Sequence, residues 1–216
     1  MDIIYLGHSS FKIKGKNMSV VTDPFDPKKV GLKFPKTEAE VVTISHHHDD
    51  HDAYSQVDGV KRVVDGPGEY EIGGVSIVGI SSFHDDKKGE ERGKNTIYSI
   101  ELDGLTIAHL GDLGHSLSED KIKELTDVDV LMIPVGGEFT IDSKAAVEIV
   151  KQINPTIVIP MHYQTPGLNP ETFSKLASPD AFLAEVGLKV EKLPKLSIKA
   201  GDLVVEDQKV VLLEKR

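Results

Sequence analysis

The stretch from position 41 to position 51, Val-Val-Thr-Ile-Ser-His-His-His-Asp-Asp-His, joins an apolar run to a cluster of side chains that bind metals. Its second half has the spacing H-x-H-x-D-H, which singles out His46, His48, Asp50 and His51. Alternate residues of a strand point to the same side, so His46 and His48 can share one metal ion. After the chain turns, Asp50 and His51 can present to a second metal nearby. The stretch therefore predicts a buried strand that ends in a metal site, and a solvated histidine cluster is the alternative.

Three further residues of the same chemical types lie at or just past the ends of predicted strands. Ligands commonly collect at strand ends in α/β sheets. Together with the H-x-H-x-D-H run, these residues suffice for two metal sites with nitrogen and oxygen ligands, completed by a shared carboxylate. They are, with the apolar run that each follows, His84 (75–83), Asp112 (105–110) and His162 (156–161).

Short apolar or alternating runs predict a chain rich in β-strands, with helices mostly in its second half. Helices are predicted at 118–125, capped by Ser118, from Asp142 as N-cap through 153, and from 170 toward 177. The segment 23–36, rich in Pro and Lys, is predicted to be a surface loop. The predicted strands are 3–6, 10–14, 19–22, 41–44, 61–64, 69–72, 75–80, 96–102, 105–110, 128–135 and 156–161, with two or three more in 196–213.

Composition excludes several classes of protein. The chain has 216 residues, no cysteine and a formal net charge of −10. The length fits a single domain over 1–216. The acidic balance argues against an extended nucleic-acid surface, and the lack of cysteine excludes disulfides, thiolate catalysis and iron–sulfur clusters. With no signal peptide and no apolar run of about 18 residues, we expect a cytoplasmic protein without a membrane span.

The order and spacing of these motifs resemble the metallo-β-lactamase superfamily over essentially the whole chain. A narrower resemblance is to its branch of ascorbate-6-phosphate lactonase-like metal-dependent hydrolases. That branch is indicated by the stretches Leu-Gly-His-Ser-Ser-Phe (6–11), Ala-His-Leu-Gly-Asp-Leu-Gly (108–114), Pro-Val-Gly-Gly-Glu-Phe-Thr-Ile (134–141) and Ile-Pro-Met-His-Tyr (159–163). The implied fold is an α/β four-layer αβ/βα sandwich, with two mixed β-sheets, outer helices and the metals at one edge.

The resemblance also implies how the ligands are shared. One or two divalent transition metals per chain are expected, zinc first, with manganese, nickel, iron or cobalt as alternatives. His47 and Asp49 fill the variable positions of the motif, which leaves open an alternative register or a role behind the ligands. The implied ligands are His46, His48 and His84 at the first metal, Asp50, His51 and His162 at the second, and Asp112 between them.

Further residues are candidates for catalytic or supporting roles near the metals. Asp50 would both bind a metal and orient the nucleophile. His8 follows Gly7 in the turn between the first two strands. It is predicted to be an extra ligand, a proton donor or a residue behind the ligands, and the alternative is a structural histidine hydrogen-bonded to backbone in a tight turn. Weaker candidates are His109 and Asp23 as supports of the ligands, His115 as a pocket or loop residue, Gly136 and Gly137 as a loop that receives an anionic group or as a plain turn, and Tyr163, for which a structural role is favoured.

The expected function is that of a metal-dependent hydrolase, in which hydroxide held by the metals, bridging two of them, cleaves a small anionic ester such as a phosphodiester or a lactone. One alternative is an oxidoreductase with a single metal on the same fold, and another is a metal-binding protein with little catalysis. The sequence predicts neither a membrane nor an extended nucleic acid as partner, and it leaves a homo-oligomer open.

Overall fold

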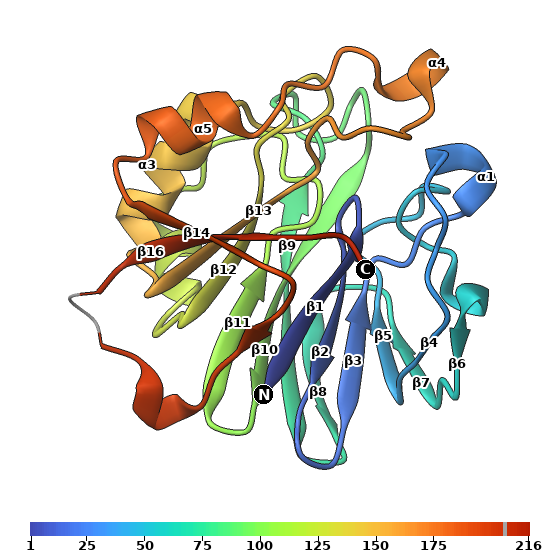
Figure 1. Cartoon of the computed structure of the whole chain (residues 1–216), viewed down its shortest axis with the longest axis vertical. Helices are drawn as coiled ribbons and strands as arrows, with labels where there is room; N and C mark the ends of the chain where they lie inside the picture. Colours follow the sequence, from blue (N-terminus) through green and yellow to red (C-terminus); the bar gives the residue numbers. More distant parts are fainter. Residues whose placement is uncertain (205–206) are drawn as a thin grey trace.

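Two β-sheets packed face to face form the centre of the molecule in the computed structural model, which describes residues 1–204 and 207–216 (Figure 1). The first sheet contains, in order across it, β15 (Leu196–Ser197), β1 (Asp2–Gly7), β2 (Ser10–Lys14), β3 (Ser19–Thr22), β5 (Val41–Thr43) and β7 (Arg62–Val64). The second contains β14 (Lys189–Leu193), β16 (Lys209–Leu213), β13 (Ile157–Met161), β12 (Val130–Pro134), β11 (Leu105–His109), β10 (Lys94–Leu102), β9 (Val75–Phe83) and β8 (Gly68–Ile72).

Both sheets mix parallel and antiparallel pairs, as predicted. In the first sheet β1, β2 and β3 pair antiparallel, whereas β3, β5 and β7 pair parallel. In the second sheet, neighbouring strands from β8 to β11 pair antiparallel. The remaining pairs, β11–β12, β12–β13, β13–β16 and β16–β14, are parallel. A small third sheet pairs β4 (Thr37–Glu38) with β6 (Val57–Asp58).

The main core lies between the two sheets, and the period of two along each strand decides which side chains enter it. Val20 of β3 and Met132 of β12 point into this core. Their neighbours Val21 and Leu131 point to the opposite faces, where they enter two outer cores. Because both faces of β12 and β13 are covered, these two strands are apolar without interruption, as buried strands are expected to be.

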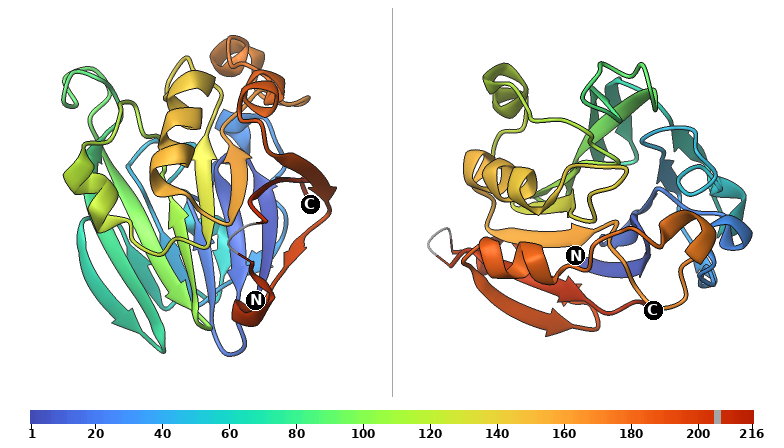
Figure 2. Two further views of the ribbon diagram at one scale, coloured as in Figure 1. Left: turned by 90° about the vertical axis from the view of Figure 1, so that its left-hand side faces the viewer. Right: turned by 90° about the horizontal axis from the view of Figure 1, so that it is seen from above.

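Helices cover the outer face of the eight-stranded sheet. They are α2 (Glu119–Glu124), α3 (Ser143–Ile153) and α5 (Asp180–Glu185), and Figure 2 shows α3 lying along the sheet. The outer layer of the six-stranded sheet is thinner, and it is built from α1 (Pro27–Val30), α4 (Pro170–Phe173), the 3-10 turn η1 (Tyr54–Gln56) and the small third sheet. A second 3-10 turn, η2 (Ala200–Asp202), follows β15. The layers are those of the predicted sandwich.

The predicted strands up to position 161 are all present, with ends that differ by a few residues. Both predicted N-caps are also confirmed, since Ser118 accepts a hydrogen bond from the amide of Lys121 and Asp142 accepts one from the amide of Ala145. In the stretch 196–213 the structure contains β15 and β16, and residues 205–206 of that stretch lie outside the described part of the chain.

Other local predictions were wrong. The segment 23–36 is a loop apart from α1, but it does not lie wholly on the surface, because Phe25, Val30, Leu32 and Phe34 are buried in the outer core of the six-stranded sheet. The helix that begins at position 170 ends at Phe173, and the sequence did not predict α5 or β14. Among the described residues, every helix is too short or too polar to cross a lipid bilayer.

Candidate metal centre

The predicted ligands all follow strands that run in one direction within their own sheet. In the six-stranded sheet, β1, β3 and β5 are parallel to one another because β2 is antiparallel to both β1 and β3. In the eight-stranded sheet, β9, β11 and β13 likewise share one direction. The carboxyl ends of these strands, from both sheets, therefore meet at one edge of the sandwich, where all seven predicted ligands come together.

One group of potential ligands consists of His46, His48 and His84. One ring nitrogen from each lies within 4.8 Å of the others. The His46 and His84 rings are buried, with centroids 4.6 Å apart, while His48 lies exposed at the rim. β5 ends at Thr43, so His46 and His48 lie in the irregular segment that follows it, and the path of that segment, not the alternation of a strand, brings their rings to 4.6 Å between centroids.

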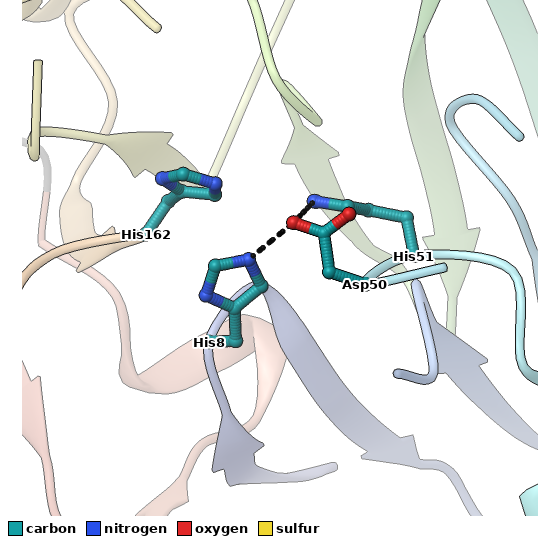
Figure 3. A group of neighbouring side chains, drawn as sticks. All are labelled: His8, Asp50, His51 and His162. Atoms are coloured by element: carbon teal, nitrogen blue, oxygen red, sulfur yellow. Dashed lines mark hydrogen bonds and ion pairs between the residues drawn. The ribbon is translucent and has the colours of Figure 1, made fainter. Parts of the chain in front are cut away.

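A second group consists of His8, Asp50, His51 and His162, again with one atom of each within 4.8 Å of the others. Figure 3 shows Asp50 between His8 and His51, with the His162 ring facing His8. Asp50 Oδ2 lies 3.1 Å from His8 Nε2 and 3.6 Å from His51 Nε2. The rings of His8 and His162 are 4.2 Å apart. His8, in the turn after β1, therefore lies among the predicted ligands of the second metal.

Asp112 lies between the two groups. Its Oδ2 atom is 3.2 Å from His84 Nε2, 3.2 Å from His162 Nε2 and 3.3 Å from His51 Nε2. The same oxygen is 3.9 Å from His46 Nε2. A carboxylate in this position contacts ligands of both groups, which is the placement that a bridging residue needs.

The donor atoms at the centre of the cluster fit a metal. His46 Nε2, His51 Nε2, Asp112 Oδ1 and both ring nitrogens of His162 are buried and have no hydrogen-bond partner among the described residues. Buried polar atoms in proteins are nearly always paired, so a cluster of such atoms needs a further partner. Imidazole and carboxylate groups without any thiolate suit zinc and the other divalent transition metals.

Electrostatics favours the metal-binding protonation states at Asp112, His46 and His8, whereas at His51 it favours the protonated imidazolium, which must lose a proton before it binds a metal. Burial would raise the pKa of Asp112, but the neighbouring His162 and His51 outweigh it and hold that pKa well below its usual value. Burial lowers the pKa of His46 well below its usual range, and it lowers the pKa of His8 to about 4. Burial also acts to lower the pKa of His51, but the carboxylates of Asp112 and Asp50 raise it well above normal. Ionised carboxylates and neutral imidazoles are the forms that bind metals.

Asp23 holds two of the candidate ligands from behind. Its Oδ1 accepts the Ser45 amide at 2.8 Å, and its Oδ2 accepts the Ser45 hydroxyl at 2.6 Å and His51 Nδ1 at 2.8 Å. The Ser45 hydroxyl also lies 2.9 Å from His46 Nδ1. These contacts leave the Nε2 atoms of His46 and His51 turned toward the cluster, which is how carboxylates commonly orient histidine ligands.

His109 and Asn95 fix the turns that carry His8 and Asp112. His109 Nε2 donates to the carbonyl of Ser9 at 2.8 Å, and its Nδ1 accepts the amide of Gly111. Asn95 accepts the Asp112 amide at 2.9 Å and donates to the carbonyl of Leu110. A side chain at Gly111 would collide with Asn95 and Ser45, so this turn requires glycine.

Three residues of the site have backbone conformations that L-residues rarely adopt. The φ angles are 56° at His8, 39° at Asp23 and 52° at His162. The His162 amide also donates to the carbonyl of His8 at 3.0 Å, which ties the end of β13 to the turn after β1. Strained conformations of this kind persist where the surrounding structure imposes them, and they cluster at functional sites.

The remaining sequence candidates lie outside the cluster. His47 and Asp49 are exposed and point toward Asp52 and Lys29, so they belong to neither ligand group. His115 accepts the amide of Phe83 and so supports the end of β9. Tyr163 is buried and packs beside Tyr5.

The glycine loop has a structural explanation in this fold. A side chain at Gly136 would lie 2.1 Å from the carbonyl oxygen of His162, so the two backbones meet there. The amides of Phe139 and Thr140 both donate to the carbonyl of Gly137. These two amides are therefore used within the turn, and binding of an anionic group by the amides of Gly136 and Gly137 stays a prediction.

Sequence reasoning missed Asn95 and Ser45. Asn95 is a buried polar residue near the start of a long apolar strand, where asparagine is disfavoured, and that mismatch was the available signal. Ser45 gave no signal of its own, since serine is ordinary at the end of a strand.

Comparison with known proteins agrees with this geometry. The model of the beta-lactamase superfamily domain matches residues 2–162. A UPF0173 metal-dependent hydrolase from Thermococcus onnurineus is 31% identical over 207 residues, covering 82% of this chain and 92% of that protein. A similarly named protein from Pyrococcus abyssi is 30% identical over 208 residues, covering 82% of this chain and 92% of its own length.

A crystal structure from Thermotoga maritima has the same fold. That protein is a member of the metallo-beta-lactamase superfamily for which zinc-dependent hydrolysis has been suggested. It is 36% identical, with a TM-score of 0.81, and the match covers 99% of this chain and 98% of that one. None of these three relatives is named an ascorbate-6-phosphate lactonase, so the narrower branch stays a prediction. The domain match, the relatives and the fold together show that this chain belongs to the metallo-beta-lactamase superfamily.

Proposed function

We propose that this chain is a metal-dependent hydrolase that cleaves a small anionic ester, such as a phosphodiester or a lactone, at a centre of two divalent metals. The position of Asp112, whose Oδ2 lies within 3.3 Å of His51, His84 and His162, carries the proposal. Family membership and the names of the curated relatives support the coarser part, a metal-dependent hydrolase. The number of metals and the class of ester are proposed in addition, from the geometry and chemistry of the site.

The proposed ligands form two groups, one for each metal, with one residue shared between them. Zinc is the first candidate metal. Divalent metals held there would supply hydroxide from bound water near neutral pH and would polarise the attacked carbonyl or phosphoryl oxygen. The ligands are His46, His48 and His84 on one side, Asp50, His51 and His162 on the other, and Asp112 on both.

Asp50 is the ligand that we propose also orients the attacking water. Its side chain is 20% exposed, whereas that of Asp112 is 2% exposed. Both line a cavity of about 260 Å³, whose lining also includes Phe139 and Phe173. A carboxylate open to this cavity can accept a proton from water that enters with the substrate.

His8 has a defined relation to Asp50. The ring is buried, and its Nε2 lies 3.1 Å from Asp50 Oδ2. We propose that His8 holds Asp50 in place. A His8→Gln variant that loses metal would identify His8 as a ligand, whereas loss of turnover with metal retained would fit the orienting role or a proton donor.

The test combines metal content with turnover. Elemental analysis of protein purified without added metal or a histidine tag should give about two divalent ions per chain. The wild type should then hydrolyse members of a phosphodiester and lactone panel, and Asp50→Ala should lower the rate by about 100-fold or more. Asp49→Ala is the matched control, because Asp49 is 64% exposed and pairs with Lys29 outside the cluster.

Two results would contradict the proposal. One is an Asp50→Ala variant that retains both metal and full rate. The other is a single iron per chain together with oxygen consumption, which would support the oxidoreductase with one metal.

A further inference from the structure

A larger cavity adjoins the metal centre on the side of β7 and β9. Its volume is about 580 Å³, and its lining includes Pro67, Phe83 and Lys94. It shares two residues, His48 and Arg92, with the smaller cavity of about 260 Å³ that opens onto Asp50 and Asp112. The two cavities therefore meet at Arg92, and each is of a size that suits a small molecule or part of one.

Arg92 is the one arginine or lysine that lines both cavities in the described part of the chain. Its side chain is 35% exposed, and its nearest carboxylate oxygen, on Glu91, is 3.8 Å away. The guanidinium lies 5.7 Å from the centre of the Phe139 ring. The side chain makes no hydrogen bond within residues 1–204 and 207–216, so its planar set of donors is available to a ligand.

The backbone around Arg92 is held firmly relative to the metal centre. The buried carboxylate of Asp85 accepts the amides of Lys87, Gly89, Glu91 and Arg92 at 2.7 to 3.0 Å. The amide of His84 in turn donates to the carbonyl of Gly93, which closes the loop at its base. The segment 85–92 therefore fixes Arg92 in the same structural unit as the candidate ligand His84.

We propose that Arg92 binds the anionic group of the substrate, an oxyanion of the phosphate or carboxylate class, while the apolar remainder lies along Pro67 and Phe83. Arginine binds such oxyanions through two parallel N–H donors, with both charge and geometry matched. This inference rests on the proposed function, because it places the bond to be cleaved over Asp50 and Asp112. It adds a residue that sets substrate specificity and that none of the sequence motifs indicated.

The test measures binding separately from turnover. Zinc-loaded wild type, Arg92→Gln and Arg92→Lys are titrated by calorimetry with phenylphosphonate and with benzoate, neither of which is hydrolysed. Arg92→Gln should weaken binding of the preferred oxyanion by about 10- to 100-fold, since a charge-assisted hydrogen bond is lost. Arg92→Lys should recover part of that loss, and Lys151→Gln, on the exposed face of α3, should bind as the wild type does.

The two probes identify the oxyanion. If the binding affinity for phenylphosphonate falls more in Arg92→Gln than the affinity for benzoate does, the substrate carries a phosphate. If the affinity for benzoate falls more, the substrate carries a carboxylate. Equal binding by wild type and Arg92→Gln, with zinc content unchanged, would refute the role of Arg92. Loss of zinc in Arg92→Gln would refute it as well, because the residue would then act on the metal centre.

These experiments separate failure of the proposed anion site from failure of the proposed hydrolase function. A zinc-loaded wild type that binds the probes through Arg92 but hydrolyses nothing in the ester panel would retain the anion site and reject the hydrolase. Hydrolysis that is lost upon Asp50→Ala but unaffected by Arg92→Gln would retain the hydrolase and reject the anion site.

Discussion

Asp23→Asn tests whether the carboxylate behind the metal centre prepares two of its ligands. In the wild type, Oδ1 of Asp23 accepts the Ser45 amide, and Oδ2 accepts both the Ser45 hydroxyl and His51 Nδ1. Asparagine has nearly the same shape, but one of its two terminal atoms donates instead of accepting. With the oxygen kept against the Ser45 amide, the NH₂ group faces His51 Nδ1, and the two donors oppose each other.

The magnitude follows from that lost contact. A hydrogen bond to a charged group contributes about 1.5–3 kcal/mol. If His51 instead moves its proton to Nε2, the proton occupies the atom that would bind the metal. Either route predicts a loss of metal affinity of about 10- to 100-fold, which is also the usual effect of removing a residue that orients a ligand.

Competition with a chromophoric chelator measures the affinity, and circular dichroism checks that the variant is folded. Asp129→Asn is the matched control, because Asp129 accepts the Thr106 amide at 2.8 Å at the opposite ends of the strands. Nitrogen NMR of the histidine rings reports which nitrogen of His51 carries the proton. A folded Asp23→Asn variant with wild-type affinity and an unchanged His51 tautomer would refute the reasoning.

Two further predictions concern the loop after β9 and the edge of the eight-stranded sheet. Asp85→Asn removes the acceptor for two of the four amides that Asp85 binds. Hydrogen exchange of the amides in the segment 85–92 should therefore become faster, while metal content stays constant. Exchange as slow as in the wild type would contradict this account. Lys189 and Lys209 lower the pKa of Glu191 to about 2, from a usual value of 4.5, so their stabilisation is complete above pH 4.5 and disappears as the pH falls toward 2. The difference in unfolding free energy between wild type and Glu191→Gln, measured with urea across that range, should shrink in the same direction, and a constant or growing difference would overturn the assignment.

The sequence predicted the centre of this protein well because strand ends and ligand spacing are local properties. The H-x-H spacing alone identified His46 and His48 as a pair of ligands, and the structure places both in one ligand group. The placement of His84, Asp112 and His162 at strand ends was readable for the same reason. The single domain over 1–216 and the cytoplasmic location stay predictions.

What the sequence did not reveal depends on distant contacts. Asn95 binds the backbone on both sides of the Gly111 turn, and that pairing exists only once β10 and β11 lie side by side. Phe25 and Phe34 lie in a segment with the composition of a loop, and they are buried because the outer face of the six-stranded sheet needs a cover. The left-handed backbone at His8 and His162 is likewise imposed by tertiary structure, because histidine alone does not favour it.

Because the candidate ligands come from both sheets, a metal bound by them would affect the stability of the folded state. The chain has no cysteine, yet His51 of one sheet and His162 of the other lie in a single ligand group. An ion bound there would cross-link segments far apart in the sequence and reduce the conformational freedom of the unfolded chain, as a disulfide does in a secreted domain. Opening of the sandwich at this edge would then require the ion to leave, so the lifetime of the folded protein would follow the rate of metal release.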